Sequence, residues 1–359
     1  MFTLPMDMET LLVDSRGLEQ VESVLASSFA RSKARAATLG PTYLQLWETL
    51  ETCAAGGKRF RPRMVMTAYD CLSGPDRATA ALVAASFEML HTALIVHDDV
   101  IDRDFVRRGI PNVAGTYRNQ AEAAGLGVDD ATHRGLSMGL IAGDLALSSA
   151  HRLLDGVRTD PATRERLGEL LDDAVFASAA GELLDVDASI SGTAGAEDPL
   201  QMARLKTAVY SFESPLKAGA ILAGADHAIV ETLGDFGRDV GIAYQIADDI
   251  LGVFGDEETT GKTNWGDLRE GKRTALITYV AQRAEWEQIS GLIGSAELSA
   301  DGVEEIRRVL KTSGALEYAV SLATDYAQRA LRHLDSTHIP VRLKTGLTPV
   351  AAAVLDRVR

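Results

Sequence analysis

The stretch ALVAASFEMLHTALIVHDDVID (residues 81–102) decides the fold class of this chain. Ala and Leu dominate it, its apolar residues recur at helical spacing, and no Gly or Pro interrupts it. The pattern predicts a long buried helix with an acidic end. Asp98 and Asp102 are four residues apart, so both carboxylates are expected on one face of that helix.

This acidic helix end predicts a metal site. Like charges four residues apart destabilise a helix, and a divalent cation with oxygen ligands would offset that cost. Magnesium typically takes one or two carboxylates together with substrate phosphates. A solvated helix end is the alternative, but the apolar run before Asp98 favours a buried position, and therefore the metal.

The rest of the chain predicts the same fold class. Of 359 residues, 46% are hydrophobic and 6% aromatic, and no run of alternating β-branched residues is bounded by hairpin turns. We expect an all-α, single-domain bundle of about ten or more helices over residues 1–359. The acidic N-terminus is unlike a signal peptide, and no apolar run approaches the length that spans a bilayer. Cys53 and Cys71 are expected to be reduced thiols of a cytoplasmic protein.

Charge narrows the class of ligand. The formal net charge of −15 argues against nucleic acid as a partner, because an acidic chain repels its phosphates. Basic residues are nevertheless concentrated in GGKRFRPR (residues 56–63), in VRRG (residues 106–109) and at Lys206, Lys262 and Lys272. Arg and Lys are the usual ligands of phosphate oxygens. Their position beside acidic clusters predicts a diphosphate site.

A second acidic cluster lies in YQIADDILGVFGD (residues 244–256). Asp248 and Asp249 come near the end of another apolar helix, but Gly252 stands where a carboxylate four residues after Asp248 would be. The two acidic helix ends are expected to face each other across a cavity and to hold a diphosphate through metal ions. Alone, this cluster is weaker evidence than the first.

The motifs, taken in order, resemble the trans-isoprenyl diphosphate synthase family, which includes farnesyl and geranylgeranyl diphosphate synthases. The resemblance covers roughly residues 50 to 280 and depends on an ordered series rather than on any one motif. The matching segments are GGKRFRP from Gly56, His91, DDVID from Asp98 with RRG after it, GDLAL from Gly143, GELLD from Gly181, KT at Lys206, QIADDILGVFGD from Gln245, GK at Gly261 and DLREGKRT from Asp267.

The resemblance implies a helical isoprenoid synthase fold around a central cavity and a magnesium-dependent prenyltransferase with about three ions per site. The implied metal ligands are Asp98, Asp102 and Asp248, with possible support from Asp249. The implied contacts to isopentenyl diphosphate are Lys58, Arg61, His91 and Arg108. The implied contacts to the allylic diphosphate are Arg107, Lys206, Lys262 and Lys272. Thr207 and Gln245 are implied to steady the carbocation. The family is typically a homodimer, and we expect one here.

Product length is expected to depend on residues upstream of Asp98 along its helix. Ala93 and Leu94 are small or mid-sized where members that stop at farnesyl diphosphate often carry aromatics, and Leu90 and Phe87 could form a floor deeper down. Geranylgeranyl diphosphate is therefore preferred over farnesyl diphosphate, with longer products third. A terpene cyclase and a non-catalytic partner subunit are the alternatives of another class. A terpene cyclase has no second diphosphate for GGKRFRP to bind. A non-catalytic subunit tends to lose its acidic clusters, whereas DDVID is intact here.

Overall fold

The computed structural model describes residues 15–191, 198–255, 265–295 and 297–357. They fall into two compact units, each described here by itself. The N-terminal unit holds Val13–Leu171 and Ala218–Gly224, and the C-terminal unit holds Asp172–Lys217 and Ala225–Arg359. The all-α fold class is confirmed, whereas the expected single domain stays a prediction.

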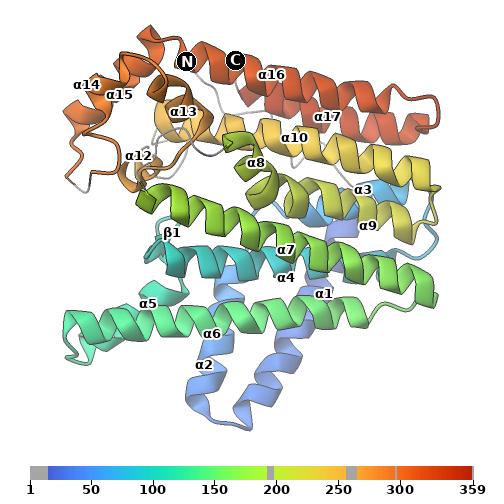
Figure 1. Ribbon diagram of the computed structural model, residues 1–359. Coiled ribbons are helices and arrows are strands. Elements are labelled where there is room, and N and C mark those ends of the chain that lie inside the picture. The colour runs from blue at the N-terminus through green and yellow to red at the C-terminus, as the bar shows by residue number, and fades with distance from the viewer. Residues whose placement is uncertain (1–14, 192–197, 256–264, 296, 358–359) are drawn as a thin grey trace. The chain divides into compact units, whose positions relative to one another are not determined.

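The N-terminal unit is built from helices that pack around α4 (Figure 1). Its elements are α1 (Ser15–Ala37), α2 (Pro41–Ala54), α3 (Phe60–Cys71), α4 (Arg77–Ile101), β1 (Val106–Arg107), β2 (Ile110–Pro111), α5 (Val113–Ala123) and α6 (Val128–Asp155). Two further helices, α7 (Pro161–Ser191) and α9 (Ser214–Leu222), are divided between the units.

Helix α4 is the predicted apolar helix and forms the core of its unit. The carboxylate of Asp76 caps its first turn by accepting a hydrogen bond from the Ala78 amide at 3.0 Å. Helices α1, α3 and α6 pack against α4, and most of its side chains are buried. Gly143 of α6 lies against the His97 ring, where a Cβ would collide, so α6 approaches α4 closely.

Burial explains why α4 also has the composition of a membrane span. Within the described residues it is long and apolar enough to cross a bilayer, but 78% of its apolar window is buried inside the protein. The expectation that no apolar run approaches bilayer-spanning length was therefore wrong for this helix. Its hydrophobicity is that of a core helix, which has apolar neighbours on nearly every face.

A short hairpin follows α4. Strands β1 and β2 are antiparallel, with Arg107 opposite Ile110. The two turn residues, Arg108 and Gly109, have φ angles of 54° and 76°, as a tight hairpin turn requires. The hairpin reverses the chain directly after the acidic helix end, and it was not expected from the sequence.

The C-terminal unit is organised around α10, which packs against η2, α16 and α17. Figure 1 shows α10, α16 and α17 running alongside one another. Besides its part of α7 and α9, the unit contains α8 (Pro199–Ala203), the π-helix η2 (Arg204–Glu213), α10 (His227–Phe254), α12 (Gly266–Glu270), α13 (Ala275–Ala281), α14 (Trp286–Ile289), α15 (Ala300–Thr312), α16 (Ala315–Leu334) and α17 (Val341–Arg357).

Two glycines of α10 let η2 approach closely. A Cβ at Gly237 would lie 2.7 Å from the Cα of Glu213, and one at Gly241 would lie 2.6 Å from the Cα of Ala208. These distances are shorter than any normal contact, so only glycine fits. Because π-helical turns are rare and often lie at functional sites, η2 is a candidate position for functional residues in this unit.

Candidate active site

The first acidic cluster lies at the C-terminal end of α4, as predicted. The Asp102 amide donates to the Asp98 carbonyl at 2.9 Å, so the last helical turn continues as far as Asp102. The two carboxylates are therefore one turn apart on one face, the arrangement that the sequence predicted. Asp98 is partly exposed, with a side-chain exposure of 26%, and can reach a ligand in solvent.

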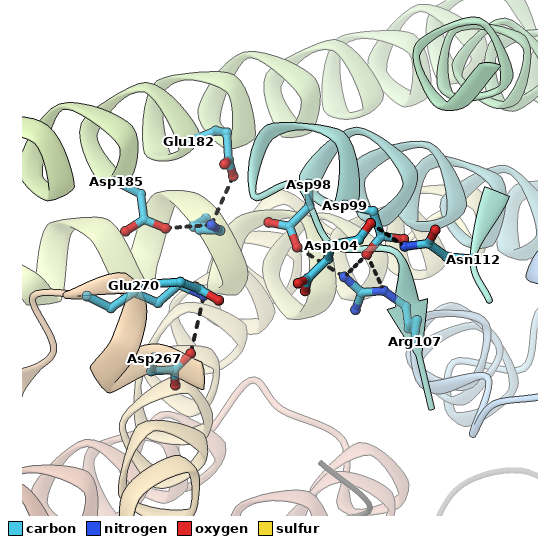
Figure 2. A network of polar contacts seen from close by, with 11 residues as sticks. Asp98, Asp99, Asp104, Arg107, Asn112, Glu182, Asp185, Asp267 and Glu270 are labelled. Atoms are coloured by element: carbon cyan, nitrogen blue, oxygen red, sulfur yellow. Dashed lines mark hydrogen bonds and ion pairs between the residues drawn. The ribbon is translucent and has the colours of Figure 1, made fainter. Parts of the chain in front are cut away.

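The hairpin turns Arg107 back onto this cluster. Figure 2 shows Arg107 between the carboxylates of Asp98 and Asp99. Its Nε donates to Asp99 Oδ1 at 2.8 Å, and its Nη2 lies 3.2 Å from Asp98 Oδ2. Asp99 is only 4% exposed, and burial raises the pKa of its carboxyl to about 6, although Arg107 opposes that rise.

The hairpin and the start of α5 fix each other. The Asn112 side-chain amide donates to the Asp104 carbonyl at 2.8 Å, and its oxygen accepts from the Gly115 amide at 2.8 Å as the cap of α5. Figure 2 shows Asn112 beside Asp104. Arg107 is consequently held by a structured turn rather than by a free loop.

A cationic cluster forms around the GGKRFRP segment in the same unit. The Arg108 guanidinium lies over Gly57, where a Cβ would come within 3.3 Å of both terminal nitrogens. Burial lowers the pKa of His91 in α4 well below its usual range. The nearby guanidinium groups of Arg61, Arg107 and Arg108 lower this pKa further. Segments far apart in the sequence thus gather several cations and one neutral imidazole.

In the C-terminal unit, Lys206 of η2 is held by two acids of α7. Its Nζ lies 2.6 Å from Asp185 Oδ2 and 3.0 Å from Glu182 Oε2. Figure 2 shows both acids extended from α7. A Cβ at Gly181 would lie 2.6 Å from the Lys206 amide nitrogen, so the glycine of GELLD permits this close approach of the two helices.

A hydrogen-bonded chain links η2 to the second acidic cluster. Thr207 Oγ1 donates to Gln245 Oε1 at 2.6 Å, and Gln245 Nε2 donates to Asp249 Oδ1 at 2.8 Å. Both oxygens of the predicted carbocation pair therefore lie side by side. Burial, and then the charge of Asp267, raise the pKa of Asp249 well above its usual range.

A model of the polyprenyl synthetase family matches residues 45–312 of this chain. This chain belongs to the polyprenyl synthetase family. A geranylfarnesyl diphosphate synthase of Aeropyrum pernix is 35% identical over 286 residues, which are 79% of this chain and 84% of that protein. A geranylgeranyl diphosphate synthase of Sulfolobus acidocaldarius is 31% identical over 78% of this chain and 81% of its own length.

The fold agrees with the same family. The crystal structure of a geranylgeranyl pyrophosphate synthase of Corynebacterium glutamicum, complexed with isoprenyl diphosphate and magnesium, is similar at a TM-score of 0.88. That match has 28% identity and covers 96% of this chain and 100% of the other. The predicted resemblance is confirmed, and this polyprenyl synthetase is a prenyltransferase.

The synthetase also has an acidic residue that the motif reading did not single out. Asp267 of α12 lies beside Gly252, where a Cβ would be 2.8 Å from Asp267 Oδ2. Gly252 stands where the motif often has a carboxylate, and its missing side chain leaves room for the carboxylate of Asp267. Nothing in the local sequence indicated this neighbour, because Asp267 is brought to Gly252 only by the fold.

Lys272 and Asp248 lie in this part of the synthetase as well. Lys272 Nζ contacts Asp267 Oδ1 at 3.2 Å and Glu270 Oε2 at 2.8 Å. Asp248 is half-exposed, and its Oδ1 lies 3.5 Å from an Arg357 nitrogen of α17. Lys262 lies outside the described residues.

The residues predicted to set product length all lie on α4. The exposed fractions of Ala93, Leu90 and Phe87 are at most 1%, whereas Leu94 is half-buried. Leu94 is one turn before Asp98 and shares its face. Ala93 is one turn before His97, whose ring lies against α6, so Ala93 is on the face that packs against that helix.

Among the described residues, no three Asp, Glu, His or Cys side chains form a ready-made metal cage. This fits magnesium, which is usually bound through one or two carboxylates and the phosphates of a substrate. The Asp98 and Asp102 pair supplies hard oxygen ligands one turn apart, which is the donor set that such an ion accepts.

Proposed function

We propose that this synthetase condenses isopentenyl diphosphate head to tail with an allylic diphosphate, releasing diphosphate and forming mainly geranylgeranyl diphosphate. The observation that carries the proposal is the pairing of two sites in the N-terminal unit: the Asp98–Asp102 carboxylates and the cationic cluster at GGKRFRP. One suits a metal-bound diphosphate, and the other suits a diphosphate held by nitrogen donors alone. A cyclase has no second diphosphate to bind.

The allylic diphosphate is assigned to the acidic clusters. From the family resemblance, Asp98 and Asp102, and separately Asp248, are proposed as magnesium ligands; the ion when bound would supply positive charge that stabilises the departing diphosphate. Arg107, Lys206 and Lys272 would bind its oxygens. Acidic neighbours already orient each of these three side chains. A diphosphate would either displace those carboxylates or bind the same cation beside them. Lys262 is proposed for the same role from the family resemblance.

Isopentenyl diphosphate is assigned to Lys58, Arg61, His91 and Arg108. The lowered pKa of His91 keeps its imidazole neutral near pH 7, so it would donate a hydrogen bond to phosphate without adding charge. The guanidinium groups around it supply the charge. This arrangement holds the homoallylic double bond in place while the diphosphate itself does not react.

The chain's residues then guide the reaction without a protein nucleophile. The allylic C–O bond breaks, its electrons leave with the diphosphate, and the double bond of isopentenyl diphosphate forms the new C–C bond. The proton lost from the adjacent carbon goes to the departing diphosphate. The Thr207 and Gln245 oxygens, 2.6 Å apart, are proposed to stabilise the cation through their dipoles.

The decisive test is diphosphate release from an allylic diphosphate, measured with and without isopentenyl diphosphate. We expect release that requires both substrates and MgCl2 and that stops when EDTA is added. A binding measurement is run in parallel, because MgCl2 with inorganic diphosphate should raise Tm. Release without isopentenyl diphosphate would indicate a cyclase, and no release at all would indicate a non-catalytic subunit.

Product length is predicted to respond to the face of α4 above Asp98. Leu94→Phe should shift the main product toward farnesyl diphosphate, because a ring one turn above Asp98 on the same face blocks the growing chain. Ala93→Phe should shorten the product less, because Ala93 lies on the face toward α6. Product chromatography is the measurement. Ala93→Ser, which keeps the side chain small, serves as the control. An unchanged product from both folded aromatic variants would show that this face does not set the stop.

Assembly is predicted to be a homodimer. Leu140 and Ile141 of α6 are 52% and 43% exposed, an apolar pair on a helix surface that a second copy could cover. Light scattering at micromolar concentration should report twice the mass of one chain. The double substitution Leu140→Asp and Ile141→Asp should yield a monomer, and a dimer that survives it would place the interface elsewhere.

We also propose a cytoplasmic location. Cys53 and Cys71 are half-buried, and neither forms a disulfide within the described residues. Cysteines outside disulfides are typical of proteins in a reducing compartment.

A further inference from the structure

Arg59 is the most deeply enclosed cation of the GGKRFRP segment. It is 9% exposed, and its Nη1 donates to Glu88 Oε1 of α4 and to the Ala54 carbonyl, both at 2.8 Å. Its Nε and Nη2 donate to the two oxygens of Glu22 in α1, at 2.5 and 3.2 Å. One guanidinium therefore joins α1, the end of α2 and α4.

These contacts neutralise Arg59. Two carboxylates face a single positive charge, and the charge-assisted hydrogen bonds to both raise the pKa of the guanidinium against the effect of burial. At 9% exposure this guanidinium is enclosed by its two acids, whereas Arg107, Lys206 and Lys272 remain 25%, 26% and 28% exposed and accessible to a diphosphate. Its role is consequently different from that of a phosphate ligand.

The backbone around Arg59 is in a conformation that needs support. Gly56, Gly57 and Arg59 have φ angles of 74°, 82° and 48°. Left-handed backbone suits glycine but is disfavoured for arginine, whose Cβ crowds the chain. Arg59 also immediately precedes α3, so its conformation sets the direction in which that helix starts.

The positions next to Arg59 are the ones proposed to bind isopentenyl diphosphate. Lys58 precedes it and Arg61 follows two residues later, while Glu88 is one helical turn before His91 on α4. The Arg108 guanidinium lies over Gly57 of the same loop. The positions of Lys58 and Arg61 therefore depend on how the backbone at Arg59 is held.

We infer that Arg59 is a positioning residue that anchors the isopentenyl diphosphate site through Glu88 and Glu22. The inference rests on the proposed function, since it assumes that this loop binds the homoallylic substrate. Arg59 acts through its neighbours and not by contact with phosphate. Its loss should therefore weaken binding of one substrate and leave the other site in place.

The test compares Arg59→Lys, the double variant Arg59→Met with Glu88→Gln, and the control Arg77→Met. The double variant removes both members of the buried pair and leaves only Glu22, which is 50% exposed to solvent, so no buried charge is left without its partner. Arg77 of α4 pairs with Asp70 at 2.9 Å, near the end of α3 that is away from the loop. Isothermal titration with isopentenyl diphosphate alone measures affinity without turnover.

We expect the double variant to bind isopentenyl diphosphate at least about tenfold more weakly, with KM for the allylic diphosphate within about twofold of the wild type. Saturating isopentenyl diphosphate should restore most of kcat. Arg59→Lys should fall between, because one ammonium cannot reproduce the fork to two carboxylates. Arg77→Met should bind like the wild type, although its Tm falls.

Equal affinity for isopentenyl diphosphate in the wild type and in either folded Arg59 variant would overturn the inference. A parallel loss of affinity for both substrates would overturn it as well, because it would indicate general destabilisation. If the wild type itself does not bind isopentenyl diphosphate, the proposed function fails instead, so the two failures are distinguishable.

Discussion

Alanine at Asp98 or at Asp102 is expected to lower kcat by at least about 100-fold, the typical cost of losing one transition-state electrostatic group. Both carboxylates lie on the last turn of α4, with Asp102 hydrogen-bonded through its amide to Asp98. The two carboxylates would together hold magnesium, which would supply positive charge to the leaving diphosphate, and one carboxylate alone would hold it less firmly. Steady-state kinetics over a range of MgCl2 concentrations is the measurement.

The matched control for these variants is Asp155→Ala, an exposed acid at the end of α6. It lowers the negative charge of the chain by the same amount, so a general charge effect would appear in both. The variants at Asp98 and Asp102 should keep the wild-type Tm without ligand and lose the rise in Tm that MgCl2 with inorganic diphosphate produces. Wild-type turnover in both variants would exclude the metal role.

Arg107→Ala is expected to remove activity and also to lower the free energy of unfolding by about 3 kcal/mol at pH 8. The structural cost arises because Asp99 is 4% exposed and loses its guanidinium partner at 2.8 Å. A buried carboxylate without a partner is costly when charged but much less so when protonated. Urea denaturation at two pH values measures the effect.

The pH dependence of the stability loss follows from the titration of Asp99. Its pKa of about 6 in the folded chain is above the ordinary 3.8, so charging it reduces stability as pH rises from about 4 to 6. Removing Arg107 moves that window upward, because the guanidinium favoured the charged form. The variant should therefore lose less stability at pH 5.5 than at pH 8.

A second substitution separates structure from function. Arg107→Ala combined with Asp99→Asn should recover most of the stability at pH 8, since no buried charge remains, but it should not recover turnover. Recovery of turnover would mean that Arg107 serves only to neutralise Asp99. An equal loss of stability at both pH values would contradict the assignment of the cost to this carboxylate.

Local sequence determined the helices and the residues that carry chemistry. The Ala- and Leu-rich stretch before Asp98 has helical periodicity and no helix breaker, so α4 was predictable from short-range preferences alone. Asp98 and Asp102 share a face for the same reason, because four residues nearly complete one helical turn. The ordered motifs likewise identified the family without any knowledge of tertiary contacts.

Tertiary structure decided what those residues contact. The side chain that holds Lys206 comes from Asp185, and the carboxylate beside Gly252 comes from Asp267, both distant in the sequence. Such pairings depend on how helices pack, and nothing in the local sequence encodes the partner. The hairpin that turns Arg107 onto Asp99 was also missed, because two residues per strand leave no periodic pattern.

Arg59 illustrates the difference most clearly. In the sequence it is one of several cations in GGKRFRPR and cannot be told apart from the proposed phosphate ligands beside it. In the folded unit its charge is matched by Glu22 and Glu88, which are 37 and 29 residues away along the chain. Composition determined that this segment is basic, whereas the packing of α1 and α4 decided that Arg59 is enclosed by two acids, since only folding brings those acids to it.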